Sequence, residues 1–440
     1  MSNASSHVQS PTPRFTSPRA AGGRFIEHDK PSKIIDISPD SSAIVSTAAF
    51  RWNAEVQLHM RGRHIGQSEH RDAAAVRDLV ALRDAIRTGV EFSVGPDGSV
   101  RKVPDGVKGY FRSRSGGTTG AAKTIRRSHA SWITSFHVNR DHLGLGADDR
   151  YAVLGVPAHS LALYALVEGA YLGADLHSFA GLRPRHQVRG ITDAQATILY
   201  ATPTQLRLLC ETGDLLPSLR HVLCGGGRLT PELRHRIAAL CPNATLCEFY
   251  GAAETSFIAW GDGSGPAGSV GRAYPGVEIR IDATDGPFGE IWVRSPYLFD
   301  GYTEGDSAET RKSDGFVTVG EMGQLDDEGY LTVAGRRNRM VTIADQNVFP
   351  EDIEALLLAD PAVTHCAVIP LPDARRGTCL VAAIDGPAEA DLCDALLVRC
   401  RAAFGPLAAP RRLQVLDDFP LTLSGKPDLA AIARLLDPQA

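Results

Sequence analysis

The sequence predicts an α/β protein with a large N-terminal domain, which combines β–α sheets with a β-rich subdomain, and a small, mobile α+β C-terminal domain. Three observations support this fold class. Short apolar runs alternate with helix-like segments between residues 151 and 249, Gly-Pro turns and short strands dominate after about residue 262, and a second alternating pattern begins near residue 341. Strand–helix alternation is typical of a parallel or mixed sheet covered by helices.

Hydrophobic spacing and turn residues place the individual elements. We expect helices at 72–88, 161–172, 203–211 and 230–240, and strands at 151–156, 196–200, 221–224 and 245–249. The β-rich part is expected to have strands at 277–281, 289–293, 316–319 and 330–333. The C-terminal part is expected to have helices at 350–358 and 390–404, and strands at 365–370, 379–385 and 412–415.

Composition divides the chain further. Residues 1–25 are rich in Ser, Pro, Thr and Arg, which predicts a flexible leader. A core domain is expected at 26–335 and a lid domain at 341–440, and the basic stretch between them predicts a hinge at 336–340.

The overall composition limits the class of protein. The 440 residues include 46 Lys and Arg and 51 Asp and Glu, for a net charge of −5, and 43% are hydrophobic. These values are ordinary for a folded soluble protein and exclude a disordered chain or a collagen-like fibre. A slightly acidic chain is also a poor candidate for a dedicated nucleic-acid binder, which needs a basic field.

The apolar runs and the cysteines of the sequence indicate where in the cell the protein is expected. The sequence has no run of about 20 apolar residues and its N-terminus has no apolar core of a secretory signal, although a transit peptide is an alternative. Eight cysteines are scattered without a C-x-x-C pair, which does not support a zinc or redox motif. We therefore predict a cytoplasmic protein with reduced thiols and no membrane or nucleic-acid partner.

The strongest local signal is the segment 113–123 (SRSGGTTGAAK). Glycines let backbone N–H groups approach an anion, hydroxyl groups add donors and a lysine adds charge. This combination suits a polyphosphate, although the spacing is not that of a Walker loop. A flexible Gly/Ser turn is the alternative interpretation.

Three further segments carry candidate chemistry. In 248–255 (EFYGAAET), an acid follows an apolar strand, where it could ligate Mg²⁺ beside an aromatic ring that could stack on a base. In 315–321 (GFVTVGE), followed by Gly335 and Arg336, an acid and an arginine could grip ribose and phosphate. In 421–426 (LTLSGK), a lysine follows a Gly-Ser turn. Each segment alone could equally be a surface turn with solvated charge.

In this order, the four segments resemble the signature of the adenylate-forming superfamily, which comprises acyl- and aryl-CoA synthetases, adenylation domains of peptide synthetases, and luciferases. That signature is a Ser/Thr/Gly loop, then Y-G-x-x-E, T-G-D, G-R-x-x-D and a late G-K, and the match runs from about Arg112 to Lys426. The resemblance implies an enzyme that uses ATP and Mg²⁺ to convert a carboxylic acid into an acyl-adenylate with release of pyrophosphate.

The resemblance also implies residue roles. The β- and γ-phosphates of ATP would be held by Ser115, Gly116, Thr118, Thr119, Gly120 and Lys123. The adenine would be bordered by Gly226 and Tyr250, and Gly251 would be a further cofactor-binding residue. The ribose would be bound by Glu321, which replaces the family's Asp, and by Arg336. Mg²⁺ would be ligated by Glu254 with Thr119, and Lys426 would bridge the acid's carboxylate and the α-phosphate.

The acid pocket follows by the same resemblance. His159 occupies the family's aromatic gate, for which a packed core histidine is the alternative. Candidate lining residues are Trp132, His159, Ser160, Tyr200, Thr202, Gly225 and Ala252. They suggest a compact, partly polar pocket for an aromatic or short acid, and the segment 123–129 (KTIRRSH) is similar to that of aryl-acid ligases.

Three features depart from the family pattern. Little foldable chain precedes the phosphate loop, the hinge position usually held by Asp or Lys is Arg339, and Asp345 replaces a glycine on the path of the pantetheine arm. The acceptor of the acyl group therefore stays open between CoA, a carrier-protein phosphopantetheine thiol and none. Two other functions also stay open: an ATP-dependent diazotase that adenylates nitrite to diazotise an aryl amine, and a non-catalytic nucleotide-binding homologue.

Overall fold

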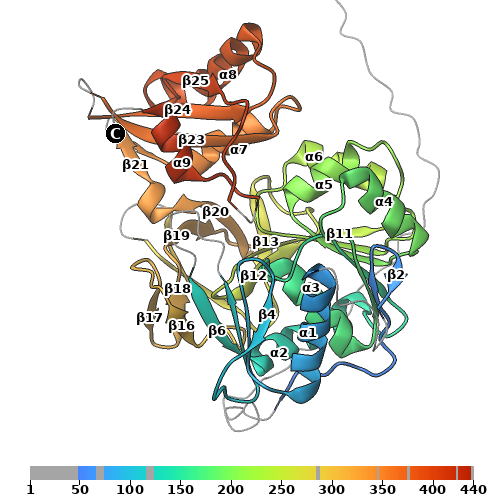
Figure 1. Cartoon of the computed structure of the whole chain (residues 1–440). Helices are drawn as coiled ribbons and strands as arrows, with labels where there is room; N and C mark the ends of the chain where they lie inside the picture. The colour runs from blue at the N-terminus through green and yellow to red at the C-terminus, as the bar shows by residue number, and fades with distance from the viewer. Residues whose placement is uncertain are drawn as a thin grey trace, which may run out of the picture. The chain divides into compact units, whose positions relative to one another are not determined.

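The computed structural model describes residues 48–65, 74–114, 123–283, 288–343, 346–373, 377–422 and 425–437. Its central feature is a large mixed sheet with a parallel half and an antiparallel half (Figure 1). The parallel half has the spatial order β11 (Thr245–Ala252), β10 (His221–Cys224), β9 (Ile198–Ala201), β7 (Arg150–Val153), β8 (Asp175–Ser178) and β1 (Leu58–Met60), with β2 (Arg63–His64) antiparallel at its edge.

Helices cover both faces of the parallel half because its strands are apolar on both faces. Tyr151 and Leu223 point into a core shared with α1 (Ala74–Thr88), α2 (His129–Leu143) and α3 (Ser160–Leu172). Their strand neighbours Ala152 and Val222 point into a second core, with α4 (Pro184–Asp193), α5 (Pro203–Cys210) and α6 (Pro231–Leu240). Figure 1 shows these two helix groups on opposite sides of β11. The predicted α/β class is confirmed.

The antiparallel half continues the same sheet beyond β11. Its order is β12 (Ser256–Gly261), β13 (Ser269–Ala273), β20 (Tyr330–Arg336), β19 (Glu321–Leu325), β15 (Gly289–Arg294), β18 (Phe316–Thr318) and β17 (Arg311–Ser313), and β14 (Glu278–Asp282) also pairs with β15. A separate sheet has the order β16 (Gly301–Glu304), β6 (Thr124–Ser128), β5 (Tyr110–Arg114), β3 (Phe92–Val94) and β4 (Val100–Lys102). This part is β-rich, as predicted.

The C-terminal part is α+β and has its own apolar cores. It contains the hairpin β21 (Val341–Ile343) and β22 (Gln346–Val348), the sheet β23 (His365–Asp373), β24 (Gly377–Asp385) and β25 (Arg412–Val415), and the helices α7 (Pro350–Leu358), α8 (Ala390–Ala408) and α9 (Leu429–Leu436). Within α8 the backbone leaves the helical region at Gly405, whose φ is +80°. Regular helix therefore ends at Phe404, as the sequence predicts.

Local signals explain the helix starts close to the site. Thr202 begins α5 with a capping box, in which its hydroxyl accepts from the Gln205 N–H and its own N–H donates to the Gln205 side chain. Thr230 caps α6 and Pro231 follows at the first helical position. These caps fix the directions in which the chain leaves β9 and β10, where site residues are predicted.

The leader predicted at 1–25 lies outside the described residues. The end of the core domain at residue 335 and the start of the lid domain at residue 341 stay predictions.

Candidate active site

The predicted phosphate loop joins β5 to β6, which pair as a hairpin with Arg114 opposite Thr124. Ser115, Gly116, Thr118, Thr119 and Gly120 lie outside the described residues. Lys123, at the end of the loop, is half-buried, and its Nζ lies 5.6 Å from the centre of the Tyr302 ring. The cation therefore points toward β16.

Glu254 lies in the turn between β11 and β12, and Tyr302 also contacts it. The Tyr302 hydroxyl donates to Glu254 Oε1 at 2.8 Å and is 2.8 Å from the Thr310 hydroxyl. Burial raises the pKa of Tyr302, and the neighbouring Glu254 carboxylate adds to this, so the phenol stays a donor. Tyr302 thus joins two predicted site residues, Lys123 and Glu254, although no motif in the sequence points to it.

The turn that carries Glu254 is tightly built. A Cβ added at Gly251 would lie 1.9 Å from the Ser256 carbonyl oxygen, so the chain requires glycine there. The Ala252 N–H donates to the Thr255 hydroxyl at 3.1 Å, and the Phe299 N–H donates to the Glu254 carbonyl at 2.9 Å. The carboxylate consequently has a fixed position at the carboxyl end of β11.

The residues around Glu254 fit a Mg²⁺ ion that is carried by the substrate. Mg²⁺ prefers oxygen ligands and is commonly held by one or two carboxylates together with substrate phosphates and water. Glu254 supplies one hard carboxylate, and the described residues contain no group of three or more His, Cys, Asp or Glu side chains that could hold a metal ion by themselves. The donor set therefore suits a metal–nucleotide complex better than a metal site made of protein ligands alone.

A second polar group gathers at the adjoining strand ends. Tyr250 on β11 donates its hydroxyl to Glu321 Oε2 on β19. Glu321 lies opposite Arg336 in the β19–β20 pair, with 3.7 Å between Glu321 Oε1 and Arg336 Nε. Three residues that the sequence assigns to one nucleotide site thus come together from three strands.

Lys426 completes this group from the C-terminal part of the chain. The Thr422 N–H donates to the Lys426 carbonyl at 2.7 Å, and the Gly425 N–H donates to the Thr422 carbonyl at 2.9 Å. Gly425 has a φ of +75°, which glycine adopts without strain. The turn places the Lys426 ammonium within electrostatic range of Arg336, Glu321 and Glu254.

The surroundings of Lys426 change its acidity. Burial lowers the pKa of Lys426, the nearby Arg336 cation lowers it further, and Glu321 and Glu254 oppose this change. The ammonium is thus held where water no longer fully solvates it. A negatively charged substrate there would interact with a cation that water screens only in part.

Four of the predicted acid-side residues, His159, Ser160, Thr202 and Gly225, follow the carboxyl ends of parallel strands, which is where α/β sheets bind ligands. His159 precedes α3 and is half-buried, and burial lowers its pKa, which favours the neutral ring. The Ser160 hydroxyl lies 3.4 Å from the Arg114 carbonyl, at the entrance to the phosphate loop. A Cβ added at exposed Gly226 would lie 3.6 Å from the Thr202 methyl group.

Aromatic rings close the space behind Gly225. A Cβ added at Gly225 would lie 2.3 Å from the Phe249 ring, and the Phe249 and Phe257 ring centres are 4.8 Å apart. Trp132 is buried, and its indole N–H donates to the Ser256 hydroxyl at 3.1 Å. These contacts place Trp132 in the wall behind the turn that carries Ala252 and Glu254.

Tyr200 differs from the other predicted pocket residues. Its ring is 3% exposed, and its hydroxyl donates to Glu168 Oε2 at 2.6 Å. Its polar end therefore belongs to a buried network, which also includes Tyr151, Tyr164, Asn139 and Tyr274. This network was not predicted, although a glutamate within the apolar segment 161–172 was a signal for it.

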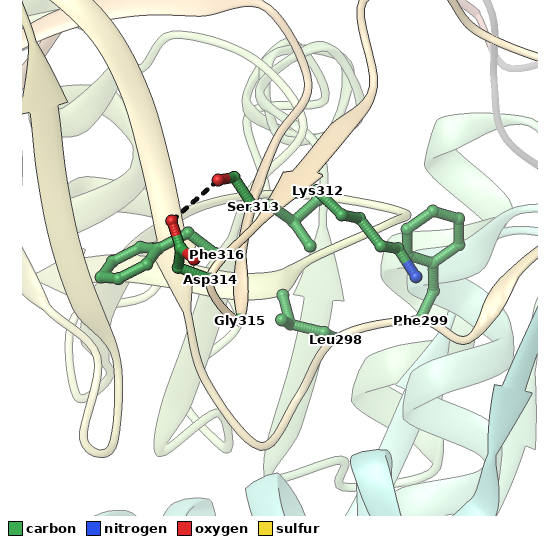
Figure 2. Close-up of a pocket in the computed structure, with 8 residues that line it drawn as sticks. Leu298, Phe299, Lys312, Ser313, Asp314, Gly315 and Phe316 are labelled. Carbon is green, nitrogen blue, oxygen red and sulfur yellow. Dashed lines mark hydrogen bonds between the residues drawn. The ribbon is translucent and has the colours of Figure 1, made fainter.

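A hollow elsewhere on the surface is lined by none of the predicted site residues. It has a volume of about 370 Å³ and lies beside the β17–β18 hairpin (Figure 2). Its lining consists of Leu298, Phe299, Lys312, Ser313, Asp314, Gly315, Phe316 and Val317. We therefore place the candidate site by its converging side chains and not by this hollow.

The predicted hinge contains a short 3₁₀ turn, Arg337–Arg339. Arg339 is anchored to the C-terminal part: it pairs with Glu354 at 2.6 Å and with Glu351 at 3.1 Å, and donates to the Val368 carbonyl at 3.0 Å. Asp345, another position that departs from the family pattern, lies outside the described residues.

Two family models and several known proteins match this chain. Residues 114–303 match the family model described as AMP-binding enzyme, and residues 352–426 match that of the AMP-binding enzyme C-terminal domain. An uncharacterized acyl–CoA ligase of Bacillus subtilis, YhfT, is 30% identical over 326 residues, which cover 72% of this chain and 66% of the relative. Indoleacetate–CoA ligase of Aromatoleum aromaticum is 34% identical over 194 residues, which cover 41% of this chain and 38% of the relative.

Solved structures show the same fold. The o-succinylbenzoate CoA synthetase MenE of Bacillus subtilis, in complex with its acyl-adenylate intermediate, gives a TM-score of 0.65 at 25% identity and covers 73% of this chain and 68% of its own. The amide bond synthetase McbA of Marinactinospora thermotolerans gives a TM-score of 0.64 at 25% identity. The match covers 76% of this chain and 71% of the McbA chain. MenE has also been solved with ATP and magnesium.

The matches leave part of the relatives uncovered. The chain spans 66%, 60% and 57% of the lengths of three curated relatives, which is less than two thirds of each. In the part of the chain that the structure describes, no helix is both long and apolar enough to cross a bilayer.

Proposed function

Since the chain belongs to the AMP-binding enzyme family, we propose that it is an ATP-dependent, AMP-forming ligase that activates a carboxylic acid as an acyl-adenylate. The observation that carries the proposal is the position of Lys426. Its ammonium lies in electrostatic range of Arg336, Glu321 and Glu254, although it comes from the far end of the chain. A carboxylate and a triphosphate repel each other, and this cluster supplies the cations that would offset the repulsion.

The chemistry follows from what each reactant lacks. A carboxylate is a poor acyl donor because its leaving group would be oxide. When its oxygen attacks the α-phosphorus of ATP, a carboxylate O–P bond forms, the bond from the α-phosphorus to the bridging oxygen breaks, and pyrophosphate leaves. The product is an acyl-adenylate, from which AMP can depart. The protein therefore mainly positions two anions and neutralises their charge.

We assign the roles as follows. Lys426 contacts the carboxylate oxygen and the α-phosphate, Arg336 and Glu321 hold the ribose and phosphate, and the Tyr250 ring lies on the adenine. Lys123 and the loop before it hold the outer phosphates. Glu254 would hold Mg²⁺ together with the ATP phosphates, and when bound this ion neutralises phosphate charge and orients the leaving group. The Tyr302 hydroxyl keeps the Glu254 carboxylate in place.

We propose an aromatic or short acid as the substrate class. The space behind Gly225 is occupied by the packed rings of Phe249, Phe257 and Tyr164, with 5.3 Å between the Tyr164 and Phe257 ring centres. A long fatty chain would have to displace these rings from a close-packed core, which is costly. The neutral His159 ring would border the acid, and CoA or a carrier-protein thiol is the candidate acceptor.

A pyrophosphate-release screen tests the proposal. Purified protein is incubated with ATP and Mg²⁺ and with panels of aryl acids, short acids, fatty acids and nitrite, each with and without CoA. We expect pyrophosphate and AMP with aryl or short acids, and a thioester if CoA is the acceptor. Pyrophosphate release that requires nitrite and an aryl amine would mean that the protein activates nitrite and not a carboxylic acid. ATP binding with no turnover on any substrate would contradict an enzymatic role.

A further inference from the structure

Arg127 is a buried cation beside the turn that carries Glu254. It lies on β6, where alternate residues face opposite sides. Arg126 faces outward and pairs with Glu91 at 3.1 Å, whereas Arg127 is 1% exposed and shares the inner face with Ile125. Ile125 packs in a cluster with Phe299, Ala253 and Tyr302, so the inner face of β6 lies against the Glu254 turn.

The guanidinium of Arg127 binds backbone carbonyls on two separate segments. Nη2 donates to the Ala253 carbonyl at 2.7 Å, and Nε donates to the same oxygen at 3.2 Å. Nη1 donates to the Tyr297 carbonyl at 2.6 Å and to the Ser131 hydroxyl at 3.3 Å. The fixed planar geometry of the guanidinium thus sets the distance between the two segments.

These two segments hold Glu254 from both sides. Ala253 immediately precedes Glu254, and Tyr297 begins the segment whose Phe299 N–H donates to the Glu254 carbonyl at 2.9 Å. The same segment continues to Tyr302, whose hydroxyl donates to the Glu254 carboxylate. Arg127 therefore fixes the backbone that precedes the carboxylate and the segment that supplies its hydrogen-bond donors.

Keeping Arg127 charged in this buried position costs free energy. All the acceptors it contacts here are uncharged, and burial lowers its pKa to about 10, although Glu254 and Asp300 partly oppose this change. Arg127 is therefore still a cation at neutral pH. A buried charge held only by neutral groups carries a desolvation penalty, so its retention needs a gain elsewhere.

We propose that Arg127 is a positioning residue for Glu254 and thereby sets the affinity of the site for Mg²⁺ with ATP. This inference rests on the proposed function, since it assigns Mg²⁺ to Glu254. Groups that orient a metal ligand, without touching the metal, typically change metal affinity by about 10- to 100-fold when they are removed.

The test measures ATP binding instead of turnover. Calorimetry gives the Mg²⁺ concentration at which ATP affinity is half-maximal, and the ATP affinity in EDTA, for the full-length wild type and its variants. For Arg127→Met we expect the half-maximal Mg²⁺ concentration to rise about 10-fold or more, with little change in EDTA. Arg127→Lys, which keeps the charge and can reach one carbonyl, should give an intermediate value, and it decides the question if the methionine variant does not fold.

Arg101→Met is the matched control. It removes an exposed arginine from β4 of the same sheet, far along the strand order from β16, so its half-maximal Mg²⁺ concentration should equal that of the wild type. An unchanged value in both Arg127 variants would overturn the inference and leave the proposed function standing. A wild type whose ATP binding does not depend on Mg²⁺ would instead overturn the assignment of Glu254, and the inference with it.

Discussion

Two polar clusters adjoin the same large sheet, and they differ in charge and in how deeply their side chains are buried. Glu168 is fully buried, and its hydrogen-bond partners are neutral groups. The Tyr200 and Tyr151 hydroxyls donate to its Oε2 at 2.6 and 3.1 Å, and the Asn139 amide donates to its Oε1 at 2.8 Å. Around Lys426 both signs of charge are present and the side chains are half-buried.

From this difference we infer that the Glu168 cluster serves structure, and we propose that the Lys426 cluster serves chemistry. The donors around Glu168 are already used within the network, so a ligand would have to break existing hydrogen bonds to enter. The Lys426 cluster brings two cations and two carboxylates together at strand ends, where a charged ligand can be bound. We therefore expect substitutions in the first cluster to change stability and substitutions in the second to change catalysis.

Removal of the Lys426 ammonium is the strongest test of this contrast. Lys426→Ala should lower the rate of ATP–pyrophosphate exchange by about 10²–10³-fold, because it removes a cation that acts on the charge of the transition state. The unfolding free energy should stay close to that of the wild type. Lys108→Ala, at an exposed position, is the control and should retain the full exchange rate. Exchange within a few-fold of wild type in Lys426→Ala would refute the role given to this residue.

Glu168 gives a prediction of comparable size in stability. Burial raises the pKa of Glu168 to about 7, and the hydrogen bonds from Tyr200, Asn139 and Tyr151 only partly offset this. In the unfolded chain the same carboxyl ionises near its ordinary value of 4.5. The native state therefore gains stability from this group below pH 4.5 and loses it as pH rises to about 7.

The isosteric variant Glu168→Gln isolates this contribution. Between pH 4.5 and pH 7 the unfolding free energy of the wild type should fall relative to that of the variant by ~3 kcal/mol, as measured by urea unfolding at several pH values. ATP affinity should stay unchanged. A pH-independent difference between the two proteins would mean that Glu168 ionises in the folded state at the same pKa as in the unfolded chain.

Glu91 offers a control with the opposite sign. Glu91 is only 1% exposed, and this burial opposes ionisation of its carboxyl group. Hydrogen bonds from Arg126 and Arg112 outweigh the effect of burial and hold the pKa of Glu91 below the usual range. Its contribution to stability is therefore present at neutral pH and is lost as pH falls through its folded pKa. In Glu91→Gln the difference from wild type should grow as pH rises toward neutrality.

Much of the fold could be predicted because its signals are local. The apolar runs at 221–224 and 245–249 form strands, and Thr230 with Pro231 begins a helix where the sequence places one. The helix α2 was missed because polar residues, among them His129, Ser135 and Asn139, lie on its buried side, so it has no apolar stripe. Those side chains are buried because their partners come from distant parts of the chain.

The site shows the same limit. Glu254, Glu321, Arg336 and Lys426 could be proposed because each lies in a short motif of the resemblance. Tyr302 and Arg127 could not, because the partners that define them lie far away: 48 residues separate Tyr302 from Glu254, and 126 separate Arg127 from Ala253. Tyr200 shows the converse, since its type and place fit a pocket but its hydroxyl belongs to the Glu168 network. A motif can identify a residue, but long-range packing decides which way its side chain points.

A matched pair of hydroxyl deletions gives the smallest expected effects and compares the two clusters directly. In each cluster a tyrosine donates to a glutamate: Tyr250 to Glu321, and Tyr151 to Glu168. Tyr250→Phe keeps the ring for adenine but frees Glu321 to shift toward Arg336. We expect the KM for ATP to rise about fivefold, equivalent to ~1 kcal/mol, with little change in kcat. Tyr151→Phe should instead lower the unfolding free energy by about 1–2 kcal/mol and leave the KM for ATP unchanged. If both variants changed only stability, Tyr250 and Glu321 would form a structural pair like that of the buried network, and their assignment to the nucleotide site would fail.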